Sequence, residues 1–247
     1  FYGASFNGTV DNVSVKRNIQ DYSKGQVGSK SGLQTIGTIE KHAVATGADL
    51  VAYRPDNSSE GNNYLRIPLT SSIIDLTSNW SISFWARRNG NTGTNYSGWE
   101  ISPDDLTGNS TYAAIPISMY IQPNGLLGLR GGGVTGTDAQ APHTHPLATV
   151  GVWRCFNVVN KSGRLYLYLD GEENFSTPAT FANPGSAYSL TIFRWSYAST
   201  RYTGRRQTDF SLFRMSQTIP SPEQIKKMYH DEKVLFAPNA KCTIYGT

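Results

Sequence analysis

Two segments of this 247-residue chain combine aromatic rings with polar side chains in a way that suits sugar binding. One is Asn95–Trp99, which includes Tyr96 and Trp99. The other, Trp195–Arg206, carries two tyrosines and three arginines: Tyr197, Arg201, Tyr202, Arg205 and Arg206. A sugar ring offers an apolar C–H face to an aromatic ring, and its hydroxyls to amide, hydroxyl or guanidinium groups. The arginines would add a preference for acidic glycans, because guanidinium groups bind carboxylates in a bidentate way.

These two segments also allow a second interpretation. Aromatic and arginine side chains are enriched at protein interfaces, so the same residues can contact a neighbouring protein instead of a glycan. The rings can also pack against the rim of the fold while the arginines stay in water. Three other tryptophans, Trp80, Trp85 and Trp153, stand within alternating runs and are assigned to the core or to sheet packing.

Carboxylates are poorly placed for glycoside hydrolysis. A retaining enzyme needs two carboxylates about 5–5.5 Å apart, one as nucleophile and one as acid. On a strand these would stand two or four residues apart on one face. Glu100 with Asp104 and Asp105 comes nearest, but Pro103 interrupts the expected strand. We therefore expect no enzymatic activity, with a polysaccharide-degrading enzyme as a distant alternative.

Metal-ligand patterns are weak. His143 and His145 place two imidazoles on one side of an extended segment, but Pro142 and Pro146 bracket that segment. Asp138 is the nearest carboxylate. The pattern favours a solvated loop, and no cofactor or metal is predicted.

Composition indicates a β-rich protein with no nucleic-acid or membrane role. Aromatic residues make up 12% of the chain and charged residues only 16%, with 24 Gly and 12 Pro. The net charge is +4. The basic residues are scattered along the chain except at Arg201–Arg206, so the sequence lacks the basic stripe of a nucleic-acid binder. No apolar run reaches the length of a membrane span. Cys155 lies in an expected strand, where it is interpreted as a small buried hydrophobic residue. A disulfide bond between Cys155 and Cys242 is the alternative.

Alternating runs of residues predict an all-β fold. The clearest is a hairpin in which Leu165, Leu167 and Leu169 share one face of a strand and tyrosines occupy the other. Asp170-Gly171 suits a tight turn with positive φ angles, so another strand should follow. Further strands are expected at residues 33–39, 43–53, 64–69, 80–88, 112–121, 126–130, 188–195 and 209–215. About nine to eleven short strands predict an antiparallel two-sheet β-sandwich.

One short C-terminal helix is expected at Pro222–Glu232. Ser221 is a good N-cap, and Gln224 completes a capping box. Ile225, Met228 and Tyr229 would form its buried stripe, following helical periodicity.

We expect a piece of a longer polypeptide with four segments. Residues 1–15 end in an alternating strand, which we interpret as the closing strand of a preceding β-domain. Residues 16–31 read as a polar linker, residues 32–235 as the main domain, and residues 236–247 as the start of a following segment.

Three segments of the main domain resemble the concanavalin A-like, laminin-G-like jelly roll. They are Trp80–Ala86, the hairpin from Trp153 through Gly171, and Phe210–Met215 leading into Ser221–Ile225. The resemblance implies a jelly-roll sandwich from Gly32 to about Leu235. Calcium occurs across laminin-G-like domains, so the resemblance makes Asp104, Asp105 and Asp138 candidate ligands without committing to a metal.

Two more stretches resemble domains of tailed-bacteriophage tail proteins. These are Gly32–Tyr53 and the C-terminal Glu223–Gly246. The resemblance implies a virion appendage, either tail fibre or head decoration, that adheres to a host-surface or environmental glycan. Its expected partners are that glycan and other virion subunits, with a homo-oligomer, favoured as a trimer, at the virion surface. The alternative is a structural spacer whose loops contact other virion subunits.

Overall fold

The computed structural model describes most of the main domain and no part of the N-terminal segment. The described residues are 34–45, 50–55, 63–70, 73–89, 97–103, 115–121, 127–130, 149–183, 187–197, 200–203, 208–238 and 240. Several predictions therefore lie outside them: the strand at Val10–Val15, the linker, and the residues Tyr96, Asp104, Asp105, Asp138, His143, His145, Arg205, Arg206 and Cys242.

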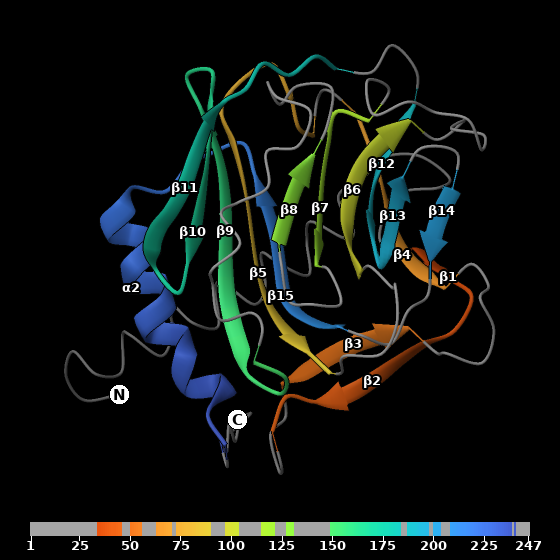
Figure 1. Ribbon diagram of the computed structural model, residues 1–247, viewed down its shortest axis with the longest axis vertical. Coiled ribbons are helices and arrows are strands. Elements are labelled where there is room, and N and C mark those ends of the chain that lie inside the picture. The colour runs from red at the N-terminus through yellow and green to blue at the C-terminus, as the bar shows by residue number, and fades with distance from the viewer. Residues whose placement is uncertain are drawn as a thin grey trace, which may run out of the picture.

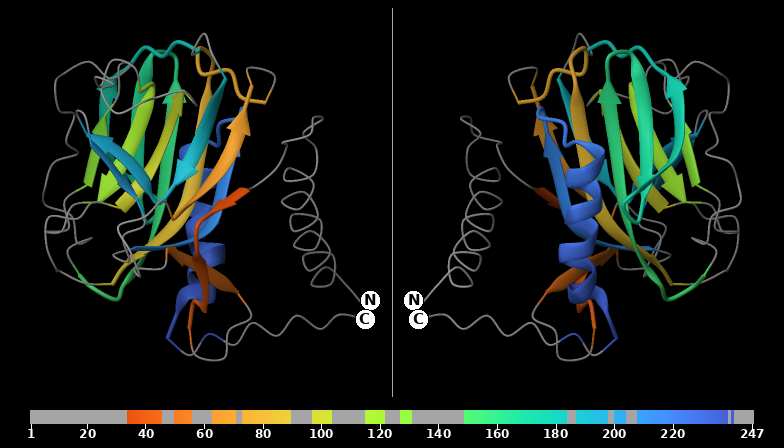
Figure 2. Two further views of the ribbon diagram at one scale, coloured as in Figure 1. Left: turned by 90° about the vertical axis from the view of Figure 1, so that its right-hand side faces the viewer. Right: turned by 90° about the vertical axis from the view of Figure 1, so that its left-hand side faces the viewer.

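Two antiparallel sheets face each other as a sandwich (Figures 1 and 2). The first has six strands, in the order β1 (Gln34–Ile36), β4 (Tyr64–Leu69), β12 (Tyr188–Ile192), β6 (Ser97–Pro103), β7 (Ile117–Ile121) and β8 (Leu127–Arg130). The second has seven, in the order β11 (Glu172–Pro178), β10 (Arg164–Leu169), β9 (Trp153–Lys161), β5 (Trp80–Arg88), β15 (Thr208–Ser216), β3 (Val51–Pro55) and β2 (Ile39–Ala43). The all-β prediction is confirmed.

The core lies between the sheets and follows the predicted alternation. Ile82, Phe84 and Ala86 of β5 point into it, whereas Trp85 belongs to a separate cluster on the outer face of the seven-stranded sheet. Phe84 stacks on Phe156 of β9 with ring centroids 5.0 Å apart. Because successive residues of a strand point to opposite sides, a single strand builds both clusters.

The β9–β10–β11 hairpins form as the sequence predicts. Asp170 and Gly171 have φ values of 52° and 88°, and Ser162 and Gly163 have 50° and 76°. Both turns therefore use the left-handed region that two-residue hairpins need. Gly171 also allows a close approach, because a Cβ there would lie 3.1 Å from the Cα of Lys226 in the helix.

The helix α2 (Pro222–Glu232) has the predicted bounds and capping box, with Ser221 as N-cap. It covers the outer face of the seven-stranded sheet (Figure 2). Ile225 is fully buried against Val159 and Tyr168, and Tyr229 stacks on Trp85. The predicted apolar stripe is thus what holds the helix to the sheet.

A short 3-10 helix, η3 (Lys233–Phe236), follows α2 and completes the outer cluster. Phe236 is buried and stacks on Trp85 with ring centroids 4.1 Å apart, and it also contacts Trp153 at 4.9 Å. Phe236 therefore packs on the outer face of the seven-stranded sheet.

The strand expected at residues 188–195 is broken in the structure. Phe193, with φ at 71°, separates β12 from β13 (Arg194–Tyr197), and β13 pairs with β14 (Thr200–Thr203) in a two-stranded hairpin. Part of the expected sugar-binding segment Trp195–Arg206 is thus a hairpin. Phe193 is buried beside Phe210, which keeps its ring in the core while the chain turns away from the sheet.

Candidate functional site

The expected sugar-stacking role of Trp99 is wrong. Trp99 of β6 is fully buried and lies in one apolar row of the six-stranded sheet with Ile192, Met119 and Leu129. Its ring packs edge-on against Phe84 at 6.5 Å. An indole enclosed on both sides cannot present a face to a sugar.

Glu100, the next residue, points to the outer face of the same sheet and is also fully buried. Its Oε1 accepts a hydrogen bond from Ser102 at 3.1 Å and lies 3.3 Å from the Nε of Arg194. The guanidinium of Arg194 in turn lies over the ring of Tyr64, 5.2 Å from its centroid. Glu100 is therefore half of a buried ion pair that anchors the first residue of β13. Pro103, expected to interrupt this strand, is instead its last residue.

The β13–β14 hairpin carries three of the predicted glycan-binding residues. Its register pairs Trp195 with Tyr202, Ser196 with Arg201, and Tyr197 with Thr200. The Phe193 amide donates to the carbonyl of Gly98 at 2.7 Å, which ties the base of the hairpin to β6. The structure thus brings Tyr197, Arg201 and Tyr202 together on one short element, beside the six-stranded sheet (Figure 1).

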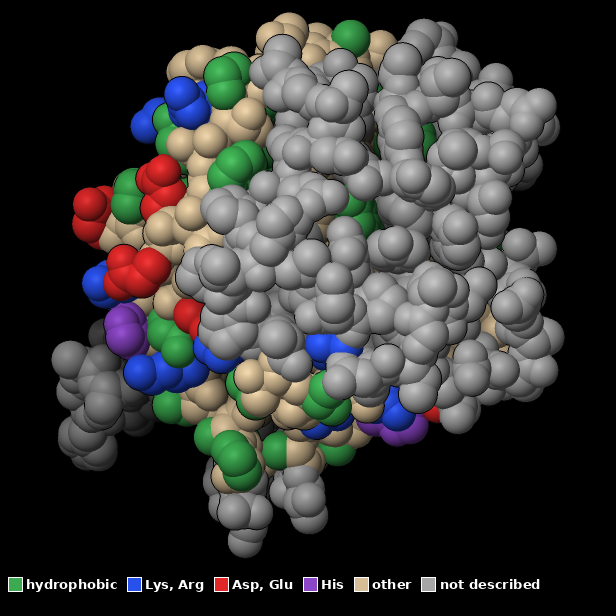
Figure 3. Space-filling view, viewed as in Figure 1, with side chains coloured by type: hydrophobic (Ala, Val, Ile, Leu, Met, Phe, Trp, Pro, Cys, Tyr) green, Lys and Arg blue, Asp and Glu red, His purple; other side chains and the backbone are tan. Residues whose placement is uncertain are grey.

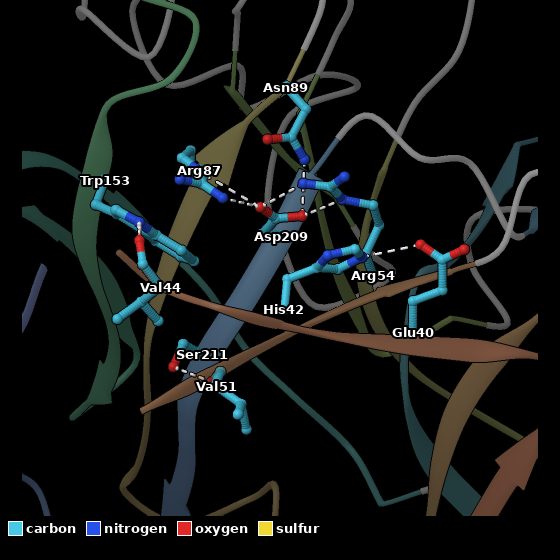
Figure 4. A network of polar contacts seen from close by, with 10 residues as sticks. All are labelled: Glu40, His42, Val44, Val51, Arg54, Arg87, Asn89, Trp153, Asp209 and Ser211. Atoms are coloured by element: carbon cyan, nitrogen blue, oxygen red, sulfur yellow. Dashed lines mark hydrogen bonds and ion pairs between the residues drawn. The ribbon is translucent and has the colours of Figure 1, made fainter. Parts of the chain in front are cut away.

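Residues that the sequence did not single out form a polar network at the end of β3, β5 and β15 (Figure 4). Asp209, near the start of β15, is fully buried. Arg54 donates to its two carboxylate oxygens, from Nε at 2.6 Å and from Nη2 at 2.9 Å. Arg87 donates to Oδ2 from Nε at 3.1 Å and from Nη2 at 2.7 Å, and the amide of Asn89 donates to Oδ1 at 2.7 Å.

The sheet register explains why these groups meet. Asp209 lies directly opposite Arg87 in the β15–β5 ladder, so both side chains share the outer face. Phe210 pairs with Tyr53, which places Arg54 on that same face. No local motif could reveal the network, because Arg54 and Arg87 lie 155 and 122 residues from Asp209 in the sequence.

The electrostatics of the network are set by its arginines. Burial alone would raise the pKa of Asp209, but the hydrogen bonds from Arg54, Arg87 and Asn89 outweigh it and lower the pKa below 3.8. The same contact with Asp209 raises the pKa of Arg54, against the opposing effect of burial. Asp209 and Arg54 therefore stay charged at neutral pH, and the guanidinium groups of Arg54 and Arg87 share one carboxylate.

Neighbouring side chains hold the network on both flanks. The guanidinium of Arg87 lies 4.8 Å above the ring of Trp153, whose Nε1 donates to the carbonyl of Val44 at 3.1 Å. On the other flank, Oε2 of Glu40 lies 2.9 Å from Nε2 of His42 on β2, and the charge of Glu40 helps to raise the pKa of Arg54. Arg87 therefore has an aromatic contact on one side, and Arg54 has an acidic neighbour.

The remaining surface features are less distinctive. In Figure 3, acidic and basic side chains intermingle along the edge formed by α2, as on a solvated helix face. Within the described residues, no three His, Cys, Asp or Glu side chains converge as a metal site would require. Over that same part of the chain, no helix has the length and apolar character of a membrane span.

Comparison with solved structures finds similar folds among toxin binding domains. The binding domain of botulinum neurotoxin DC in complex with SialylT matches with a TM-score of 0.57 and 13% identity, over 83% of this chain and 47% of that one. The binding domain of Paraclostridial Mosquitocidal Protein 1 matches with a TM-score of 0.56 and 14% identity, over 83% and 48%. This chain thus spans about half the length of these structures, and at such identity the likeness shows the fold alone.

Other botulinum neurotoxin structures show the same likeness. The DC binding domain in complex with rat synaptotagmin II matches with a TM-score of 0.57 and 12% identity, over 83% of this chain and 47% of that one. These structures are named as toxin binding domains and not as phage tail proteins, so the phage setting rests on the sequence resemblance.

Sequence comparison supplies the family. No curated protein matches the chain in sequence. A laminin G family model, described as the concanavalin A-like lectin/glucanases superfamily, matches residues 59–226. That range covers more than half of the chain and spans both sheets from β4 to the start of α2. The chain therefore belongs to the concanavalin A-like lectin/glucanases superfamily.

Proposed function

We propose that this domain is a non-enzymatic glycan-binding module and that the β13–β14 hairpin is its contact surface. The observation that carries the proposal is the hairpin register, which pairs Trp195 with Tyr202. Paired residues and alternate residues of a strand share a face, so positions 195, 197 and 202 fall on one side of the hairpin. We infer that the residues at these three aromatic positions contact a sugar ring.

The buried pair of Glu100 and Arg194 supports this assignment. It fixes the hairpin at its first residue, with Ser102 and Tyr64 holding the two charged groups in place. A contact element fixed before the ligand arrives loses less conformational entropy on binding. Glu100 thus acts as a positioning residue for the hairpin in this proposal, not as a hydrolytic acid.

The proposed setting is a virion appendage, as a tail fibre or head decoration at the particle surface. The support is the resemblance of Gly32–Tyr53 and Glu223–Gly246 to tailed-bacteriophage tail proteins. In that setting the partners are a host-surface or environmental glycan and other virion subunits, with a trimer as the favoured assembly. The lectin-like fold and the toxin binding domains that share it are compatible with adhesion.

A glycan array with the purified protein tests the function. Binding to one or more glycans is expected, and Tyr202→Ala should reduce it about tenfold, which corresponds to about 1.4 kcal/mol of binding free energy. Tyr202→Phe is the matched control, because it keeps the ring and removes only the hydroxyl. A folded protein that binds no glycan, with this hairpin buried against another subunit in the assembled particle, would instead establish the spacer function. Release of reducing ends from a polysaccharide would contradict both.

A further inference from the structure

The Arg54–Asp209–Arg87 network holds two guanidinium groups side by side. Both Nη2 atoms contact the same Oδ2 oxygen of Asp209, at 2.9 and 2.7 Å, so the groups must be adjacent. A guanidinium carries five N–H donors. Each arginine uses only Nε and Nη2 on the carboxylate, and among the described residues neither Nη1 has a hydrogen-bond partner. Each guanidinium therefore keeps N–H donors that Asp209 does not use.

The arginines reach the surface although Asp209 does not. The side chains of Arg54 and Arg87 are each 21% exposed, whereas that of Asp209 is 0% exposed. Arg54, Arg87 and Asp209 carry one net positive charge among them. Glu40 of β2, which contacts His42, also helps to raise the pKa of Arg54, so its charge offsets part of that positive charge. A buried anion beneath two partly exposed cations fixes the cations in position and leaves their outer edges to solvent.

The network is also continuous with the arginine-rich segment of the sequence. Arg206 stands three residues before Asp209 in the sequence. The hairpin ends at Thr203, which leaves only residues 204–207 before β15 begins. The proposed contact hairpin and the paired arginines are therefore joined by a short connection.

We propose that Arg54 and Arg87, braced by Asp209, form an anion subsite that binds a carboxylate or sulfate group of an acidic saccharide. The proposal rests on glycan binding by the neighbouring hairpin, and it adds the class of ligand. The oxyanion accepts hydrogen bonds from the outer Nη1 groups, while Asn89 and Trp153 keep Asp209 and Arg87 in place. Preorganised guanidinium pairs favour oxyanions over neutral hydroxyls because charge-assisted hydrogen bonds are about twice as strong.

Isothermal titration with three matched oligosaccharides tests the subsite. The probes are an oligouronate, its carboxyl-reduced neutral form, and a sulfated oligosaccharide of the same length. We expect the full chain to bind one or both acidic probes at least about tenfold more tightly than the neutral one, with an affinity that falls as salt increases. The two acidic probes distinguish a carboxylate ligand from a sulfate ligand.

Variants that each remove one positive charge test whether Arg54 and Arg87 cause the preference for acidic probes. Arg54→Gln and Arg87→Gln should each reduce the affinity for the acidic probe about ten- to a hundredfold and leave the neutral probe unchanged. Arg164→Gln is the control, since Arg164 begins β10, at the opposite end of the same sheet, and the substitution removes the same charge. Where a glutamine variant does not fold, the guanidinium NMR signals of the unmodified protein, assigned with Arg87→Lys, should shift on addition of the acidic probe.

The outcomes separate this subsite from the hairpin proposal. Equal affinity of the unmodified protein for acidic and neutral probes overturns the subsite. So does unchanged acidic binding in folded Arg54→Gln and Arg87→Gln. If Tyr202→Ala weakens every probe while the arginine variants change none, the hairpin proposal stands alone. If the arginine variants weaken only the acidic probe and Tyr202→Ala changes nothing, the anion subsite stands without the hairpin.

Discussion

Replacing Asp209 by asparagine removes the one negative charge that Arg54 and Arg87 share. The side chain keeps its size, but two guanidinium groups would then face a neutral amide at the fully buried position 209. Removing one partner from a buried ion pair costs about 3–5 kcal/mol of unfolding free energy. A domain of this size loses roughly 2–4 °C of Tm per kcal/mol, so Asp209→Asn should lower Tm by about 6–20 °C.

The same substitution should change how stability depends on pH. Asp209 has a folded-state pKa below its ordinary 3.8, so its charge stabilises the fold above pH 3.8. That stabilisation is lost as the pH falls through 3.8 toward the lowered pKa. Asp75, with a pKa of about 2, adds an acid dependence of its own in both proteins. The loss of stability between about pH 5 and pH 2 should therefore be smaller in Asp209→Asn than in the unmodified protein.

Chemical denaturation monitored by tryptophan fluorescence measures both effects. Asp231→Asn provides the control, because Asp231 pairs with Lys227 on the exposed side of α2. Its substitution should cost less than about 1 kcal/mol. An unfolding free energy of Asp209→Asn within about 1 kcal/mol of the unmodified protein, with the same acid dependence, would refute the view that this network is a tightly coupled buried group.

Three further predictions concern the helix side of the molecule. Phe236→Ala should lower the unfolding free energy measured by denaturation by about 3–5 kcal/mol, because the ring is buried against Trp85. A change near zero would contradict that packing. Gly171→Ala should cost about 1–3 kcal/mol, since φ is 88° and the new Cβ would press on Tyr229 at 3.2 Å, and a neutral result would contradict that packing. Burial, with a smaller effect of nearby acids, raises the pKa of Cys155 to about 12, so peptide-resolved mass spectrometry should show alkylation at about pH 8 only after unfolding.

The elements that the sequence predicted well are those decided by local interactions. The helix at Pro222–Glu232 has its expected bounds because its cap and its apolar stripe lie within eleven residues. The Asp170-Gly171 turn forms as expected because positive φ angles are a property of those two residues. Trp85, assigned to the core or to sheet packing, is likewise buried, because the alternation of β5 places it on the outer face opposite Phe84.

The functional residues were harder to predict because their environment is made by distant strands. Trp99 follows a polar segment, which predicts a position at the surface. In the structure β6 lies between β12 and β7, and its register places Trp99 beside Ile192 and Met119 on the inner face of the sheet. Phe193 interrupts an apparently continuous strand because its ring packs on Phe210. Neither outcome is visible in a window of ten residues.

The sequence by itself determined that this chain forms paired strands, where two of its turns lie, and which helix packs on the outside. Only the tertiary structure decided which polar groups meet. Asp209 gains Arg54 and Arg87 as partners through the order of strands in one sheet, across separations of 155 and 122 residues. Strand alternation selects the face of a sheet that a side chain occupies, but the pairing of whole strands selects its neighbours.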